Sequence, residues 1–485
     1  MINLVKNEMS KIFHKKTIYV FICIIVALGI LEVVITKSTS ILLNDKLDEL
    51  NYQMTKNNLS YYNLENSEEK EFYIMDKTWI DTYDLLKDCG YDKDSWQYYM
   101  LYNKGGGIVG RIVRADVEKN TEEKENAQSE LDALIAEVKS GEWKKYVEAD
   151  KNAVLEQIQE YKMQLDGEIS NSEKSAIERE IKSLEYQIDG YNYRLNNNIP
   201  LANTPNSDLV DTYVSNAQNY LTMNKDEKTY VDRSSLLTKR SVESNYYVAK
   251  YKLDNKIDEY DVYSANTSLK GSLSGLSFIV LIGVILVASQ IVAEEFNKGT
   301  IKQLLLRPYS RAKILLSKYC AVLLVFLFLL LLKTFVDVIS AGFIGGFNSF
   351  GSGVILYNFN TSSVQTVNWF VYGGLYFIAI LPMYLILITI AFALSCITCS
   401  TAISICLSLA YYMGSMIFIS MLAGNTKYAV FLPSQNWDFT TYLFGGLPSN
   451  KYISLTSSII VTVITYVVAF VIGFIIFKRK DIKNQ

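Results

Sequence analysis

The chain has 485 residues, of which 50% are apolar and 20% charged, and its formal net charge is −3. This mixture is typical of a membrane protein that carries a large water-soluble part. The only histidine, His14, excludes Ser-His-Asp and Cys-His catalysis in the soluble part and most zinc sites. Nothing in the composition or charge pattern indicates binding of nucleic acid.

Residues 1–16 predict an amphipathic helix on the inner membrane face, with apolar residues spaced among lysines. Its apolar positions are Ile2, Leu4, Val5, Met9, Ile12 and Phe13.

Six apolar runs of about 20 residues predict six transmembrane helices. They span residues 17–36, 272–292, 319–340, 368–394, 402–422 and 456–477. The first is too long for a secretory signal and is followed by no cleavage site, so we interpret it as an uncleaved anchor. Pro382 and the Gly373-Gly374 pair predict a kink in the fourth.

The basic residues predict the topology. Outside residues 37–271 they concentrate before the first span, after the last span, and between the second and third. The positive-inside rule therefore places both termini in the cytoplasm and residues 37–271 outside, as expected for a multi-pass plasma-membrane protein.

Residues 37–271 form a large insertion with 30 basic and 43 acidic residues and no long apolar run. The segment 172–195 shows the alternating steps of three and four that are typical of a heptad repeat. These positions are Ile177, Ile181, Leu184, Ile188, Tyr191 and Leu195. Ser170 and Glu173 have the spacing of a capping box at the start of this segment. Val154, Ile158, Tyr161 and Leu165 keep the same rhythm upstream, so we expect an antiparallel coiled-coil hairpin.

The expected fold class is therefore an all-α membrane protein, with six transmembrane helices and a mainly helical exterior domain between spans 1 and 2. The heptad positions are interpreted as self-packed core rather than as a ligand-binding stalk. The hairpin tip and the tyrosine-rich flanks are left as candidate contact surfaces. Net negative charge outside attracts cationic ligands such as antimicrobial peptides, although it also simply keeps an exposed domain soluble.

Two short motifs favour a structural interpretation. The glycine-rich segment 105–111 lacks the Gly-Lys-Ser/Thr ending of a phosphate-binding loop, so we expect a flexible loop. Cys396 and Cys399 have a redox or metal spacing, but they lie at the end of a membrane helix without a second pair, and we expect no metal there. Cys89 is the only cysteine of the insertion, which excludes an intrachain disulfide within it.

The polar segment between the second and third spans, residues 293–318, is the most informative. Its core reads EEFNKGTIKQLLLRPYSRAKILLSK from Glu294 to Lys318. We expect Gly299 and Thr300 to begin a short amphipathic helix, and Pro308 to end it. Ser310 has the position of an N-cap for the next helix.

This segment resembles the first cytoplasmic loop of type 2 ABC exporter permeases, in the spacing of its Glu pair, Gly-Thr, Leu-Leu, Arg-Pro and Ser-Arg. The resemblance covers the N-terminal helix, the six spans and this loop, but not the insertion. It implies a coupling site that contacts a separate cytoplasmic ABC ATPase, which binds ATP and Mg; no cofactor is expected in this chain. The implied coupling residues are Glu294, Glu295, Gly299, Thr300, Ile301, Leu304, Leu305, Arg307, Pro308 and Arg311.

Three charged residues fall inside predicted spans: Glu32, Lys333 and Asp337. Charges within a membrane are costly and are expected to pair or to face water. Counting helical rise from the inner interface places Glu32 and Lys333 at similar depth. We expect a cluster that lines the translocation path or its outer gate, the alternative being that each side chain reaches separately to the lipid headgroups.

The exterior segment 424–450 is aromatic and proline-containing. In the family a re-entrant helical pair occupies this place, and the alternative is that Trp and Tyr only anchor the segment at the membrane interface. Segment 341–367 is rich in Gly, Ser and Asn and carries no charge. The expected function is the permease subunit of an exporter for antimicrobial peptides or another amphiphile, working as a dimer with a second copy or a paralogue in membrane lipid. A receptor or anchor that displays a helical stalk, and a membrane enzyme, are the alternatives.

Overall fold

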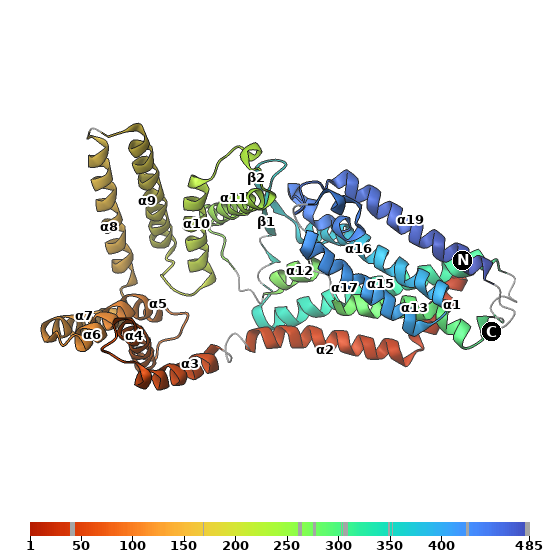
Figure 1. Cartoon of the computed structure of the whole chain (residues 1–485), viewed down its shortest axis with the longest axis horizontal. Coiled ribbons are helices and arrows are strands. Elements are labelled where there is room, and N and C mark those ends of the chain that lie inside the picture. Colours follow the sequence, from red (N-terminus) through yellow and green to blue (C-terminus); the bar gives the residue numbers. More distant parts are fainter. Residues whose placement is uncertain are drawn as a thin grey trace. The chain divides into compact units, whose positions relative to one another are not determined.

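The computed structural model describes residues 1–38, 44–167, 169–259, 264–274, 278–301, 303, 309–347, 350–351, 353–422 and 426–480. The chain divides into two compact units. The membrane unit comprises Met1–Thr36, Glu227–Thr238 and Asp261–Gln485, and the insert unit comprises Lys37–Asp226 and Lys239–Tyr260. Both units are built mainly from helices (Figure 1).

The membrane unit gathers its long helices into one bundle (Figure 1). These helices are α1 (Ile2–Phe13), α2 (Lys16–Ser38), α12 (Ala265–Ser274), α13 (Phe278–Asn297), α15 (Arg311–Gly345), α16 (Trp369–Thr398), α17 (Thr401–Leu422) and α19 (Leu455–Arg479). Their shared core includes Ile25 from α2, Leu281 from α13, Phe326 from α15, Tyr384 from α16 and Phe477 from α19.

Four of the described helices, α13, α15, α16 and α19, are long and apolar enough to cross a membrane. The pair of α1 and residues 16–31 of α2, bent by 70°, gives a fifth if it is counted as one span. The apolar part of α17, Thr401–Ile417, is shorter. The chain is therefore an all-α membrane protein by composition and helix length.

Several predicted helix bounds differ from the structure. The expected second span began at residue 272, but residues 265–274 form the separate helix α12 and α13 begins at Phe278. Serine and glycine interrupt the apolar run here, which a count of apolar residues alone does not detect. Helix α16 continues through Pro382, and α15 extends beyond both ends of the expected third span.

The segments between the long helices of the membrane unit hold an antiparallel hairpin of β1 (Val354–Asn358) and β2 (Ser363–Val367), which was not predicted from the sequence. Val354 packs with Trp369 and Tyr372 of α16. The expected re-entrant pair is represented by short turns only: η6 (Lys427–Phe431), α18 (Pro433–Asn436) and η7 (Phe439–Gly445). The backbone N–H of Phe359 donates to the carbonyl of Phe444, which joins the hairpin to η7.

The insert unit consists of helices joined by short loops in its described part. Its helices are α3 (Asn44–Asn58), η2 (Leu59–Tyr61), α4 (Ser67–Cys89), α5 (Trp96–Met100), η3 (Leu101–Gly105), α6 (Gly106–Val117), α7 (Thr121–Ser140), α8 (Trp143–Leu165), α9 (Asn171–Asn197), α10 (Pro205–Thr222), η4 (Glu227–Thr229) and α11 (Arg233–Asp254). Helix η4 and the first turns of α11 are grouped with the membrane unit.

Helices α8 and α9 lie side by side (Figure 1). Val154, Ile158 and Ile181 are buried between them, with Ile177 and Leu184 among the partly buried neighbours. The expected capping box at the start of α9 is present, because Ser170 and Glu173 exchange side-chain and backbone hydrogen bonds. The heptad positions are thus self-packed core, as expected.

The glycine-rich segment 105–111 is helical, so the expectation of a flexible loop was wrong. A Cβ on Gly106 or Gly110 of α6 would lie 3.4 or 3.3 Å from the methyl carbon of Thr82 or Thr78 on α4. These glycines therefore allow two helices to approach closely. The flanking tyrosines, interpreted as a candidate contact surface, instead build a core in which Tyr213 and Tyr246 of α10 and α11 stack.

Candidate functional site: a buried ion network beside the expected coupling loop

The structure describes only part of the expected coupling helix. Leu304, Leu305, Arg307 and Pro308 lie outside the described residues. Gly299 and Thr300, which were expected to begin the helix, lie in the turn after α13, where Gly299 has φ +66°. Ile301 and Gln303, which follow them, are helical. The Thr300 hydroxyl donates to the carbonyl of Glu295 at 3.4 Å.

Ile301 is 2% exposed and belongs to the core of the membrane unit. The first turn of the loop is therefore anchored to the bundle rather than free of it. Ser310, the expected N-cap of the next helix, accepts from the backbone N–H of Lys313 and so sets the start of α15.

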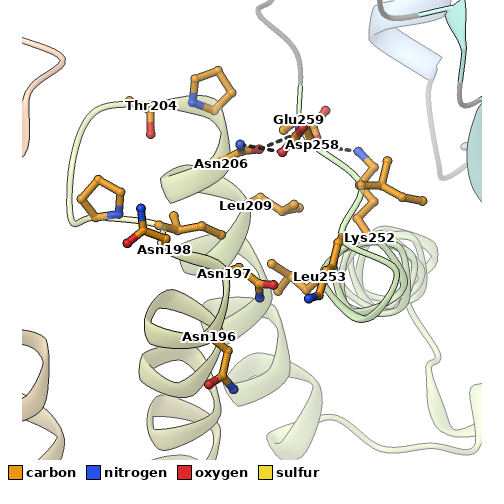
Figure 2. Close-up of a pocket in the computed structure, with 15 residues that line it drawn as sticks. Asn196, Asn197, Asn198, Thr204, Asn206, Leu209, Lys252, Leu253, Asp258 and Glu259 are labelled. Atoms are coloured by element: carbon orange, nitrogen blue, oxygen red, sulfur yellow. Dashed lines mark hydrogen bonds and ion pairs between the residues drawn. The ribbon is translucent and has the colours of Figure 1, made fainter. Parts of the chain in front are cut away.

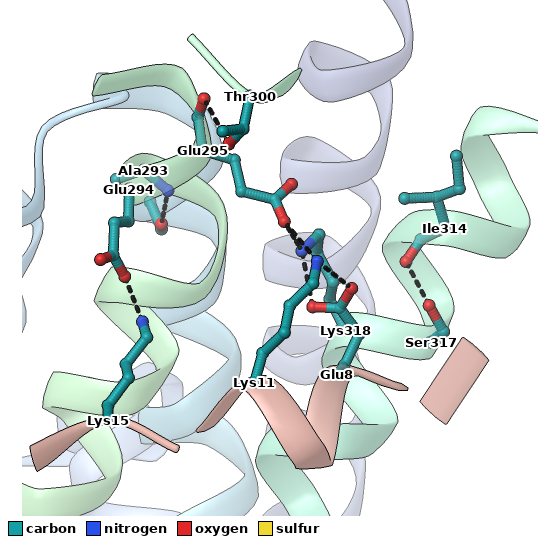
Figure 3. A network of polar contacts seen from close by, with 11 residues as sticks. Glu8, Lys11, Lys15, Ala293, Glu294, Glu295, Thr300, Ile314, Ser317 and Lys318 are labelled. Atoms are coloured by element: carbon teal, nitrogen blue, oxygen red, sulfur yellow. Dashed lines mark hydrogen bonds and ion pairs between the residues drawn. The ribbon is translucent and has the colours of Figure 1, made fainter. Parts of the chain in front are cut away.

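Lys318 is the centre of an ion network that joins three elements (Figure 3). Its ammonium lies on α15 and donates to Glu8 of α1 at 2.8 Å and to Glu295 of α13 at 2.7 Å. Lys11 of α1 contacts the same two carboxylates, at 2.9 and 3.1 Å. Two carboxylates and two ammonium groups thus compensate one another at the meeting point of α1, α13 and α15.

A second ion cluster follows on the same turn of α13. Glu294 pairs with Lys15, which lies between α1 and α2, and with Lys298 at 2.6 Å (Figure 3). Adjacent carboxylates on one helix therefore both reach the N-terminal segment. Any displacement of the end of α13 must move, or break contact with, the segment that leads into the first span.

Burial makes this network energetically demanding. The side chain of Lys318 is 1% exposed and that of Glu8 is 8% exposed. Burial alone raises the pKa of Glu8, but the charge and hydrogen bond of Lys318, with help from Lys11, hold that pKa below its usual value. Oε2 of Glu295 is buried and has no hydrogen-bond partner in the described part of the chain, which costs free energy.

Arg311, another expected coupling residue, links the start of α15 to the end of α19. Its guanidinium donates to the carbonyls of Lys478 and Lys480 at 3.0 and 3.2 Å. Lys480 in turn donates to the carbonyl of Ile397 at the end of α16, at 3.0 Å. The helix ends at this side of the bundle are thus tied together by basic side chains that bond to terminal carbonyls, as helix dipoles favour.

Two of the three charges expected within the membrane meet in the structure. Lys333 and Asp337 of α15 form an ion pair at 2.5 Å and are 8% and 5% exposed. The Ser272 hydroxyl of α12 also donates to Asp337, at 2.5 Å. The pair is therefore enclosed by protein. Glu32 lies on α2, but its side chain is outside the described residues, so its expected pairing with Lys333 stays a prediction.

Helix α2 nevertheless approaches this pair closely. A Cβ on Gly29 would lie 2.9 Å from Oδ1 of Asp337 and 2.8 Å from a methyl of Val336. The Ser340 hydroxyl lies 3.4 Å from the carbonyl of Gly29.

The insert unit contains a polar cleft of about 570 Å³ (Figure 2). It lies between the end of α9, the start of α10 and the segment after α11. Asn206 holds one wall, since its side chain donates to Asp258 at 3.1 Å and accepts from the backbone of Glu259 at 2.7 Å. Buried Arg194 does not line the cleft, but it donates to the carbonyl of Pro200, which does, and to the hydroxyl of Ser207 next to Asn206.

Sequence analysis identified Glu294 and Glu295 but missed Glu8, and it used Lys11, Lys15 and Lys318 only as topology signals. Glu8 is the one acidic residue among the lysines of the N-terminal helix, and its i,i+3 spacing to Lys11 was a usable signal. The cleft around Asn206 was also missed, because its walls come from segments about 50 residues apart.

Parts of this chain are similar in sequence to known proteins. A family model described as "Protein of unknown function (DUF2705)" matches residues 235–483, slightly more than half of the chain. The chain belongs to the DUF2705 family. The "Uncharacterized protein YhcI" of Bacillus subtilis (strain 168) is 29% identical over 240 residues, which cover 48% of this chain and 74% of that protein. No solved structure matches the chain.

Most of the insert unit, including α3 to α10, precedes the residues that the DUF2705 model matches. The family match instead includes Glu294, Glu295, Lys318, Lys333 and Asp337. The ion network therefore joins matched helices, α13 and α15, to the N-terminal helix that lies before the match.

Proposed function

We propose that this DUF2705 chain is the membrane-spanning permease subunit of an ATP-driven exporter of the type 2 ABC kind. The single observation that carries the proposal is the buried network of Glu8, Lys11, Glu295 and Lys318. It lies where the chain leaves α13 for the loop that resembles a coupling loop. A force applied to that loop would reach three helices at once.

The proposed mechanism uses this rigid connection. ATP binding closes two ATPase subunits, and the loop around Thr300 to Leu306 is received in a groove on one of them. Because Glu294 and Glu295 hold α1 and the start of α2, the N-terminal helix moves together with α13 and α15. The bundle then rocks and opens outward. Arg311 adds the end of α19 to the moving group.

The proposal includes a topology with six spans. Both termini lie in the cytoplasm, and residues 37–271 lie outside. Six described helices, α2, α13, α15, α16, α17 and α19, lie where the six apolar runs were predicted. Six spans correspond to half of an exporter, so the working unit is a dimer with a second copy or a paralogue. The ion pair of Lys333 and Asp337, close to α2, is the proposed gate residue pair of the translocation path.

We further propose that cationic antimicrobial peptides, or another amphiphile, are the exported class. The acidic excess of residues 37–271 attracts cations over long range. Within the insert unit, the cleft around Asn206 offers carboxamides from Asn196 and Asn198 and the exposed carboxylate of Asp258 (Figure 2). These groups match the donors and acceptors of a peptide backbone and one cationic side chain, so the cleft is the proposed point of peptide contact.

The test is affinity purification of the full chain from membranes of its native host, followed by mass spectrometry. A stoichiometric ABC ATPase is expected, and it should be lost when Leu304 and Leu305 are both changed to Asp. A matched control changes two lipid-facing residues of α19, Ile459 and Val463, to Ala. A well-folded preparation without an ATPase would contradict the proposal and favour a receptor or anchor that displays α8 and α9.

A further inference from the structure

An apolar groove with a volume of about 830 Å³ lies on the membrane unit, away from the ion network. Its floor and walls come from α12, α15 and the first turn of α16. The residues that define it are Leu269, Phe328, Leu331, Phe335, Val338 and Trp369. Leu331 and Phe335 are 61% and 65% exposed, so the groove opens at the surface of the bundle rather than inside it.

The length of the groove matches one leaflet of a bilayer. From Phe328 to Val338 the helix rises about 15 Å, which is half of the roughly 30 Å hydrocarbon core. The deep end at Phe328 is apolar throughout, and the end near Val338 lies close to the start of α16. An acyl chain entering at that end would therefore reach about the bilayer midplane.

Among the described residues around the groove, a basic side chain and a tryptophan lie together at one end. The ammonium of Lys270, on α12, lies 5.8 Å from the ring centroid of Trp369. Trp369 and Asn368 belong to the first turn and the N-cap of α16 and line the groove. A basic residue beside a tryptophan is the combination found at the level of lipid headgroups. The far end, at Phe328, offers no such group.

We propose that this groove is a binding site for one anionic phospholipid, with its acyl chains along α15 and its phosphate and glycerol headgroup near Lys270. The positive charge of Lys270 attracts a lipid with net negative charge, whereas the choline of a zwitterionic lipid brings a second positive charge to the same place. With the topology proposed above the lipid belongs to the outer leaflet, but the site itself does not depend on transport.

The test is native mass spectrometry of the full chain, purified in a mild detergent and mixed with palmitoyl-oleoyl phosphatidylglycerol or with phosphatidylcholine of the same chains. The unmodified chain is expected to retain one phosphatidylglycerol per copy, and to prefer it over phosphatidylcholine. Lys270→Gln should reduce this preference by about fivefold, the effect of one basic residue next to anionic lipid. It should leave the retention of phosphatidylcholine unchanged.

Groove-filling variants separate the site from general lipid contact. Leu331→Trp should abolish retention of phosphatidylglycerol, whereas Ile378→Trp, on an exposed part of α16 outside the groove, should not. Leu331→Ala, which only removes contacts, should weaken retention and serves if the tryptophan variant does not fold. Equal retention of both lipids by the unmodified chain, or no effect of either Leu331 variant, would overturn the proposal. A chain that runs as a dimer without bound lipid, and that Leu331→Trp splits into single copies, would assign the groove to a second copy instead.

Discussion

At the scale of single residues, the membrane unit places its charges where they must be compensated. Lys318 and Glu8 are almost fully buried, and so are Lys333 and Asp337. A buried pair adds little net stability, because desolvation offsets the attraction. Removing one partner is costly, however, since it leaves the other charge buried and uncompensated. Both pairs are therefore expected to respond strongly to substitution, and the pair of Lys318 and Glu8 also joins α15 to α1.

Lys318→Met should destabilise the membrane unit, because it leaves Glu8 and Glu295 with only Lys11 between them. We expect the free energy of unfolding to fall by about 3 kcal/mol. This is at the lower end of the usual cost of breaking a buried ion pair, because Lys11 still contacts both carboxylates. Thermal unfolding of the full chain in detergent measures the effect.

The matched control is Lys313→Met, which removes an exposed ammonium from the same helix and should change the unfolding temperature very little. Equal unfolding temperatures for the two variants would show that the network contributes nothing. Adding Glu8→Gln to Lys318→Met should recover part of the loss, since one uncompensated charge is then removed.

Gly29→Ala should also destabilise the unit, for a steric reason. The added methyl would lie within 3 Å of the side chains of Val336 and Asp337, so these side chains or α2 itself must shift. Overpacking of this kind costs about 1–3 kcal/mol. Gly414→Ala in α17 is the control, because nothing lies within 4 Å of its Cβ and alanine favours the helix. If Gly29→Ala unfolds no earlier than Gly414→Ala, the close approach of α2 to α15 is wrong.

At the scale of elements, the insert unit depends on packing between helices that are individually polar. Helices α8 and α9 bury a row of apolar residues where they meet. Ile158→Ala should therefore destabilise the insert unit by about 2–4 kcal/mol, whereas Leu155→Ala, 38% exposed on the same helix, should cost much less. Urea unfolding followed by circular dichroism compares the two, and equal losses would contradict the packing of α8 on α9.

Elements with strong periodicity could be predicted from the sequence, and elements set by tertiary contacts could not. The heptad spacing around Ile181 and the cap at Ser170 predicted α9 correctly. The hairpin of β1 and β2 was missed because two short strands give a weak signal, although both are rich in residues that favour strands. Gly106 and Gly110 led to the wrong prediction of a loop, because in the structure they allow close packing of two helices.

The candidate site was half predictable for the same reason. Glu294 and Glu295 stood out because they end an apolar run beside a basic loop. Lys318, which pairs with Glu295, is 23 residues further along the chain than Glu295. Glu8, which also pairs with Lys318, is more than 280 residues before Glu295. No local pattern specifies contacts across such separations, which depend on how α1 packs against α15.

At the scale of the whole molecule, the proposed topology places the insert unit and the N-terminal helix on opposite sides of the membrane. In a cysteine-free background, Asn224→Cys should react with a membrane-impermeant maleimide on intact cells, whereas Lys6→Cys should react only after the cells are opened. Both positions are exposed in their own units. Labelling of Lys6→Cys on intact cells would contradict cytoplasmic placement of the N-terminus.

The central claim is that a nucleotide-driven ATPase contacts the loop beside the ion network. The most direct measurement places a photo-crosslinking amino acid at Gln303, an exposed position in this loop, with Asn224 of the insert unit as control. We predict that Gln303 forms a crosslink to an ABC ATPase in native membranes. The yield of this crosslink should change when ATP is added, and Asn224 should form no crosslink to the ATPase. Crosslinks from Gln303 only to lipid or to unrelated proteins, with the chain intact and folded, would contradict it.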